Sequence, residues 1–342
     1  MNEQAARGLH EEALVVDAHN DSIIALIRGG NLDLYGQQRP DYPDHEGAVA
    51  YLRQYLRPLG QANQLDITKM RQGGLNAAFF AVDCTRPWGN HLLYLMDALG
   101  YFIEEVERCN GDILIARAAA DVEQAQRENK LAAVLAVENS DALEKSLHVL
   151  PLLHQLGVRA MTLTHSTRSW AGDGCEVEGG SGLTGFGRRL LERLNALGIV
   201  VDLSHLNERG FWDVVKMSDI PFMATHSCCR ALCDHPRNLH DEQLAALAEK
   251  GGVVGITFVP FFIAVQNPTL SDLLDHLDHA VSVAGIDHVG LGSDFDGGGD
   301  LVADATQLPE ITVGLAARGY CEIDIRKILG GNQLRLLKQV IG

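Results

Sequence analysis

Eight apolar stretches of strand length, separated by segments with helical periodicity, predict an α/β fold built as a single (β/α)8 TIM barrel. The stretches are almost continuously apolar, which is typical of parallel strands covered by helices on both faces. A chain of 342 residues with 46% apolar content can bury one large core or two ordinary ones. No linker separates two halves, so we expect one domain over residues 1–342.

The predicted strands are spread over the whole chain and alternate with helices. They cover residues 13–21, 75–83, 131–139, 158–165, 199–205, 221–227, 252–259 and 288–296. Apolar residues recur at helical spacing in three of the intervals, namely 186–198, 241–251 and 270–285. Each of these intervals ends in a glycine, the residue that best tolerates the left-handed backbone at a helix C-terminus.

One segment departs from the alternation. Residues 28–65 contain Pro, Gly and charged residues between the first strand and a helix expected at 66–72. Long connections inside compact domains are commonly functional loops. We therefore expect an insertion that lies over the barrel mouth as a loop or small lid.

Composition excludes several classes of partner. The formal net charge is −17 and no long run of Lys or Arg is present, so the chain is expected to repel nucleic acid. No apolar run reaches membrane length, and the first residues lack the pattern of a secretory signal. We expect no membrane partner and a cytoplasmic location.

The seven cysteines are too sparse and too scattered for a disulfide framework, so free thiols are expected. The cluster "CCRALC" at 228–233 leaves a structural zinc site as an alternative. No second Cys/His pair follows at the spacing of such a site, which favours small buried thiols.

Polar residues that can bind metal follow most of the predicted strands. In a TIM barrel the catalytic groups lie at the C-terminal ends of the strands. Six strands end in a histidine or an acid there: His19 and Asp21, Glu138, His165, His205, His226 and Asp294. Residues two apart on a strand share a face, so His19 and Asp21 can bind one ion, with Asp17 one layer below.

Each of these residues also has an ordinary structural interpretation. A single histidine at a strand end is usually not a ligand, and Asp83 after the second strand is interpreted as a loop cap. The set is more informative than its members, because four histidines and three carboxylates at one end of a barrel would be costly to bury without cations. The pattern therefore predicts a metal site.

Charge counting favours two divalent ions. Asp21, Glu138, Asp294 and one hydroxide would supply four negative charges against four positive ones. Nitrogen and carboxylate ligands without thiolate suit Zn²⁺, although Mn²⁺, Fe²⁺ or Co²⁺ would accept the same ligands. Two ions about 3.5 Å apart need a bridging carboxylate, for which Glu138 is the candidate.

Seven motifs in order carry a resemblance to a known family. They are "DAHND" (17–21), "VEN" (137–139), "TLTHS" (162–166), "VDLSH" (201–205), "ATHS" (224–227), "HPRNL" (235–239) and "GLGSDFDG" (290–297). The ordered set resembles the membrane (renal) dipeptidase family over almost the whole chain. Single motifs such as HxD are common in amidohydrolases, whereas the complete order is specific.

The resemblance implies a barrel enzyme with two zinc ions that hydrolyses dipeptides and tolerates a D-residue at the C-terminal position. His19 and Asp21 would bind one ion, His205 and His226 the other, and Glu138 would bridge them. A hydroxide held between the ions would attack the peptide carbonyl. A homodimer is also implied.

The resemblance assigns three further roles. Asp294 would carry the proton from the attacking water to the leaving amine, and His165 would stabilise the oxyanion. Arg237 would bind the terminal carboxylate of the substrate, which a guanidinium can do with two parallel hydrogen bonds. From the residues alone, Arg237 could equally be a surface arginine. Small residues often follow the bridging Glu in this family, whereas Asn139 and Ser140 follow it here, so the resemblance does not define the shape of that side of the pocket.

Two other functions fit the sequence. The first is another metal-dependent barrel hydrolase, such as an N-acyl-amino-acid hydrolase, lactonase or deaminase, because the fold does not determine the substrate. Those enzymes commonly carry HxH on the first strand, whereas this chain has His19-Asn20-Asp21. The second is a non-catalytic binding protein with the same fold.

Overall fold

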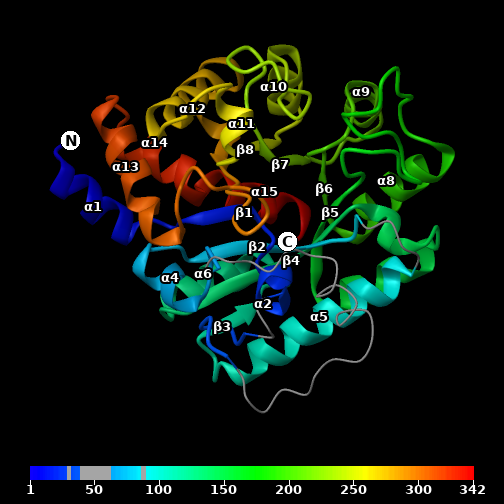
Figure 1. Cartoon of the computed structure of the whole chain (residues 1–342), viewed down its shortest axis with the longest axis horizontal. Helices are drawn as coiled ribbons and strands as arrows, with labels where there is room; N and C mark the ends of the chain where they lie inside the picture. Colours follow the sequence, from blue (N-terminus) through cyan, green and yellow to red (C-terminus); the bar gives the residue numbers. More distant parts are fainter. Residues whose placement is uncertain (29–31, 39–62, 86–89) are drawn as a thin grey trace.

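The strands form a closed parallel barrel surrounded by helices (Figure 1). The computed structural model describes residues 1–28, 32–38, 63–85 and 90–342. Eight strands close the ring in the order β1-β2-β4-β5-β6-β7-β8-β9, and β9 pairs with β1. The strands are β1 (Val16–Asn20), β2 (Ala77–Asp83), β4 (Leu131–Glu138), β5 (Val158–Thr162), β6 (Val200–Asp202), β7 (Met223–Ser227), β8 (Val253–Ile256) and β9 (Val289–Leu291).

The TIM barrel predicted from the sequence is confirmed, and all eight predicted strands form it. One described strand was not predicted. The short strand β3 (Ile113–Ile115) pairs with the first residues of β4, on the edge that β5 occupies farther along. Its three residues are too few to show a period, which explains why the sequence did not reveal it.

Two apolar layers explain why the strands are apolar on both faces. Ala77, Phe79 and Ala81 of β2 belong to an inner cluster that also contains residues of other barrel strands, residues of α6, and Leu336 of α15. The alternate residues, such as Phe80, belong to a larger cluster with the surrounding helices. The inner cluster fills the N-terminal end of the barrel, so the opposite end remains for polar side chains.

Helices follow the strands and form the outer layer (Figure 1). The longer ones are α1 (Glu3–Glu12), α5 (His91–Arg108), α6 (Ala119–Arg127), α8 (Gly185–Leu197), α9 (Glu208–Met217), α10 (Asp241–Glu249), α12 (Leu270–Ala284), α13 (Leu308–Ala317) and α15 (Asn332–Val340). The shorter ones are α2 (Ser22–Arg28), α4 (Ile67–Gln72), α7 (Leu150–Leu156), α11 (Pro260–Ile263) and α14 (Glu322–Arg326). Four predicted helices are confirmed as α4, α8, α10 and α12. Gly198 ends α8 with φ +67°, as the sequence predicts.

The predicted insertion at 28–65 falls mainly on residues 29–31 and 39–62, which lie outside the described part of the chain. The last residues of this segment, 63–65, are described and lie beside the barrel mouth. The backbone N–H of Gln64 donates to Asp296 Oδ1 over 2.7 Å, and the N–H of Asp296 donates to Gln64 Oε1 over 2.7 Å. Residues 63–65 therefore lie against the loop that follows β9.

All seven cysteines lie in the described ranges with no disulfide bond between any two of them, and those of the 228–233 cluster are buried. Within the described ranges, no helix combines the length and the hydropathy that crossing a bilayer requires.

Candidate metal centre and active site

The polar residues predicted from the strand ends converge at the C-terminal end of the barrel. His19, Glu138 and His226 lie within β1, β4 and β7, and Asp21 directly follows β1. His165, His205 and Asp294 lie three residues beyond β5, β6 and β9. Their ligand atoms form three overlapping groups: His19, Glu138 and His226; Glu138, His165 and His205; and His19, Asp21 and Asp294.

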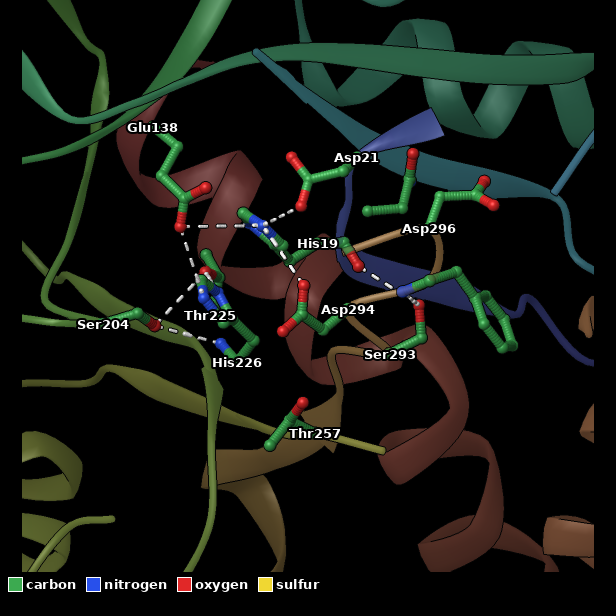
Figure 2. Close-up of polar contacts among 12 residues, drawn as sticks. His19, Asp21, Glu138, Ser204, Thr225, His226, Thr257, Ser293, Asp294 and Asp296 are labelled. Carbon is green, nitrogen blue, oxygen red and sulfur yellow. Dashed lines mark hydrogen bonds and ion pairs between the residues drawn. The ribbon is translucent and has the colours of Figure 1, made fainter. Parts of the chain in front are cut away.

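Glu138 is central to these groups. Its Oε1 atom lies 2.9 Å from His205 Nε2, 3.5 Å from His226 Nε2 and 3.9 Å from His19 Nε2. Figure 2 shows this carboxylate facing the imidazole of His19 and lying above His226. A carboxylate that meets ligand atoms from three other strand ends is placed as a bridging ligand requires.

His19 connects the histidines to a second pair of carboxylates. Its Nε2 atom lies 4.0 Å from Asp21 Oδ2 and 4.0 Å from Asp294 Oδ1 (Figure 2). The same nitrogen is buried and has no hydrogen-bond partner within the part of the chain that the structure describes. A buried polar atom normally has a partner, so this nitrogen fits a metal ligand.

The electrostatics of the cluster also fit a cation site. Burial lowers the pKa of His19 to about 3, and burial together with the charge of Arg237 lowers the pKa values of His205 and His226 well below 6.5. The imidazoles are therefore neutral at pH 7, as metal ligation requires. Burial and the charge of Glu138 raise the pKa of Asp294 well above its usual value. A divalent ion would relieve this crowding of carboxylates.

A buried carboxylate fixes the orientation of His226. Thr225 Oγ1 lies 2.9 Å from His226 Nδ1 and donates to Asp202 Oδ2 over 2.6 Å. Thr162 Oγ1 donates to the same Asp202 oxygen over 2.7 Å. This arrangement leaves Nε2 of His226 directed at Glu138, since the other ring nitrogen is occupied.

The ring of His205 is held in a similar way by Ser166, whose Oγ lies 3.0 Å from His205 Nδ1. The backbone of His205 has φ +68°, and that of Asp294 has φ +60°. Such left-handed conformations are unfavourable for residues other than glycine and are concentrated at functional sites. Both residues lie in tight turns that direct their side chains into the site.

The loop after β9 is attached to the first strand. Asp17 is buried and accepts hydrogen bonds from the backbone N–H of Ser293 over 2.6 Å and from its Oγ over 2.8 Å. Burial raises the pKa of Asp17 to about 7. The backbone N–H of Asp294 donates to the carbonyl of His19 over 3.0 Å, so these bonds set the distance between His19 and Asp294.

A cavity of about 280 Å³ opens onto the cluster, and we call it the metal cavity. It is lined by Glu138, His205, His226 and other site residues, with Arg237 and the half-buried His165 on its wall. Arg237 is 3% exposed, which excludes the surface interpretation. Asp83 also lines the cavity, and its Oδ1 accepts the N–H of Thr85 over 2.7 Å, as expected for a loop cap.

The sequence model of the membrane dipeptidase family, peptidase family M19, matches residues 3–341. The chain belongs to this family. A crystal structure of the M19 metallopeptidase dipeptidase AC is similar with a TM-score of 0.83 and 31% identity, covering 96% of this chain and 99% of the other. The expected family membership, and with it a metallodipeptidase, is confirmed.

Two more relatives of this M19 chain were found. A metallopeptidase from Rhodobacter sphaeroides, crystallised with a phosphinate mimic of the dipeptide L-Ala-D-Ala, has a TM-score of 0.82 and 29% identity over 96% of this chain and 99% of its own. An uncharacterized dipeptidase of Schizosaccharomyces pombe is 33% identical over 305 residues, which are 82% of this chain and 73% of the yeast protein.

Sequence reasoning missed the residues that support the ligand candidates of this M19 site. Asp202, Thr225 and Ser166 lie within the quoted motifs, but their hydrogen bonds depend on which strands become neighbours. Gly297 was also missed. A Cβ at this position would come within 3.0 Å of Asp21 Oδ2 and Asp294 Oδ1, so only glycine leaves room for both carboxylates.

Proposed function

We propose that the chain is a binuclear zinc dipeptidase that cleaves dipeptides with a free carboxylate and accepts a D-residue at the C-terminal position. The convergence of His19, Asp21, His205 and His226 on Glu138 carries this proposal. His19 and Asp21 would hold one ion, His205 and His226 the other, and Glu138 both. When bound, the ions would supply an activated water and polarise the scissile carbonyl.

Arg237 is suited to recognise the substrate carboxylate. Its Nη2 donates to the carbonyl of His226 over 3.0 Å, and its Cζ lies 5.3 Å from the ring centre of Phe262. These contacts hold the guanidinium between the metal ligands and an apolar wall. A fixed, buried guanidinium favours a compact substrate with a free C-terminal carboxylate over the interior of a long polypeptide.

Asp294 would transfer a proton during the reaction, and His165 would stabilise the oxyanion. Asp294 Oδ1 lies 4.0 Å from His19 Nε2, at the edge of the metal cluster. From this position its carboxylate can accept the proton of the attacking water and deliver it to the leaving amine. His165 stacks on His205 with ring centres 4.0 Å apart and borders the metal cavity, where it can stabilise the negative charge that develops on the carbonyl oxygen.

Two observations support zinc as the metal and the acceptance of a D-residue in the substrate. Nitrogen and carboxylate donors without thiolate suit zinc, with Mn²⁺, Fe²⁺ or Co²⁺ as substitutes. The Rhodobacter sphaeroides relative was crystallised with a mimic of L-Ala-D-Ala, which supports tolerance of a D-residue in this chain.

A substrate panel tests the proposal. Zinc-loaded protein is incubated with L-Ala-L-Ala, L-Ala-D-Ala, the amide of L-Ala-L-Ala, N-acetyl-L-Ala and a lactone, and released amine or acid is measured. We expect cleavage of the two free dipeptides and little cleavage of the amide, which lacks the carboxylate for Arg237. Turnover of N-acetyl-L-Ala or the lactone alone would identify another barrel hydrolase, and no turnover with full metal content would indicate a binding protein.

A further inference from the structure

A second cavity of about 260 Å³ lies beside the metal cavity. We call it the rear cavity. It is bounded by residues 175–180, by the start of α9 and by the loop between β7 and α10. His205 and Arg237 border both cavities, so the two spaces are separated by a metal-ligand candidate and by the proposed carboxylate-binding residue.

The rear cavity is rich in positive charge. Among the described residues that line it are three arginines, Arg209, Arg230 and Arg237, and one acidic residue, Glu208. Asp234 compensates part of this charge, because Arg230 Nε donates to its Oδ1 over 2.8 Å. In a chain with a net charge of −17, such a concentration of arginines around one cavity favours an anionic ligand.

Two buried polar atoms at this cavity have no partner among the described residues. They are Ser227 Oγ and Arg237 Nε, in residues that are 0% and 3% exposed. Leaving buried donors unsatisfied is unfavourable, and nearly all such groups in folded proteins are paired. A hydrogen-bond acceptor bound in this cavity would lie next to the two residues that carry these atoms.

Two helix N-termini border the same space. Asn207 is the N-cap of the ten-residue helix α9, and His240 is the N-cap of the nine-residue helix α10. The positive ends of both helix dipoles therefore add to the charge of the arginines. All three features, namely the arginines, the unpaired donors and the dipoles, favour the same chemistry.

We infer that the rear cavity is a binding site for a small oxyanion, held by Arg237 and Ser227, which regulates the site by competing with the substrate carboxylate for Arg237. The regulatory part rests on the proposed role of Arg237 in the dipeptidase reaction, whereas anion binding itself does not. An anion behind Arg237 would occupy its N–H groups and neutralise its charge. Substrate binding would weaken, while the chemical step, which depends on the metal ligands and Asp294, would change little.

Direct location of an anion tests the binding site. Crystals of the metal-loaded protein are soaked in sodium selenate, and the selenium position is found from anomalous scattering. We expect selenium in the rear cavity, within hydrogen-bond reach of Arg237 and Ser227. Selenium only at the metals or on the outer surface would overturn the inference.

Thermal unfolding in sulfate and in acetate, at matched ionic strength in sodium chloride, distinguishes tetrahedral anions from carboxylates. We expect at least one of them to raise Tm of the metal-loaded protein. The Ser227→Ala variant should keep its metal content and lose this stabilisation. An equal Tm increase in the variant would remove Ser227 from the site, and no increase with either anion would overturn the inference.

Kinetics test the link to Arg237. With the stabilising anion present, KM for L-Ala-L-Ala should rise about tenfold with little change in kcat, as expected for loss of one charged hydrogen bond. The variant Arg209→Gln should keep its activity without anion and resist inhibition. The control Arg193→Gln removes an exposed arginine that is not among the cavity residues and should be inhibited like the parent.

Equal inhibition of both variants, or a fall in kcat alone, would refute the regulatory part. Anion binding by a protein that cleaves no dipeptide would refute the proposed function and leave the binding site intact.

Discussion

The Nε2 atoms of His205 and His226 lie 2.9 Å apart, and both lie within 3.5 Å of Glu138 Oε1. The lowered pKa values leave both rings neutral at pH 7, so their nitrogen lone pairs can be shared with a cation. This geometry links the stability of the barrel mouth to metal content.

Removal of metal should therefore lower Tm. Ions that bind only the folded chain stabilise it by mass action, and their loss returns buried ligands to an uncompensated state. The measurement is thermal unfolding before and after chelation, with metal content checked by mass spectrometry, and after zinc is added back. An unchanged Tm in protein shown to be metal-free would contradict the prediction.

The variant Asp294→Asn should keep its metals and lose turnover by about 10² or more, because an amide cannot carry the proton. Asp296→Asn is the matched control. Asp296 is also a partly buried carboxylate of this loop, but it accepts hydrogen bonds from Ser22 Oγ and the Gln64 N–H. This control should lose stability more than kcat. Comparable kcat values for Asp294→Asn and the parent would exclude the proton-transfer role.

The variant Asp202→Asn should weaken metal binding by about 10- to 100-fold, the usual effect of changing a group that orients a ligand. Asp202 acts through Thr225 Oγ1 on His226, and loss of its charge weakens that chain of hydrogen bonds. Competition with a chromogenic chelator measures the affinity. The exposed Asp275, which pairs with Arg318, supplies the control Asp275→Asn, for which we expect the parent's affinity.

The variant Gly297→Ala should reduce both metal affinity and turnover. The added methyl group would displace the carboxylates of Asp21 and Asp294, whose oxygens lie against Gly297. Gly100→Ala in α5 is the control, because a Cβ there meets nothing within 4 Å. In an exposed helix interior this change should stabilise the protein by about 0.5–1 kcal/mol. Normal metal content in Gly297→Ala would show that the loop can adapt.

Stability should fall as the pH decreases below about 6.5, partly through His276. This histidine accepts the N–H of Cys229 at Nδ1 over 3.0 Å and donates from Nε2 to the carbonyl of Ile263 over 2.9 Å, which requires the neutral ring. Burial lowers its pKa below 6.5. The unfolded chain therefore binds the proton more readily, so the stability contributed above pH 6.5 is lost as the pH falls through the folded-state pKa.

Urea unfolding at several pH values measures this effect. The variant His276→Gln should show a flatter pH dependence than the parent, and the control His148→Gln, at an exposed position, should not. Identical slopes for both variants would exclude His276 as a contributor.

The strands and the ligand candidates could be predicted from the sequence, whereas the hydrogen bonds that support the ligand candidates could not. Eight strands and the ligand candidates were predictable because the C-terminal ends of parallel barrel strands lie together, so His19 and Asp294 could be placed at the same end without knowledge of side-chain positions. The support of His226 by Asp202 and Thr225 was not predictable from the sequence, because it depends on the pairing of β6 with β7 and on side-chain rotamers. The rear cavity likewise involves residues from three loops whose approach leaves no periodic pattern.

The contact between His19 and Asp294 also has a consequence for biosynthesis. Most of the sequence separates the two residues, yet His19 Nε2 and Asp294 Oδ1 lie 4.0 Å apart. Because chains fold from the N-terminus as they emerge, the ribosome must deliver β9 before the ring can close and the carboxylates can assemble. Unfinished products that lack β9 therefore lack the complete cluster, and the site assembles only after this strand has been made.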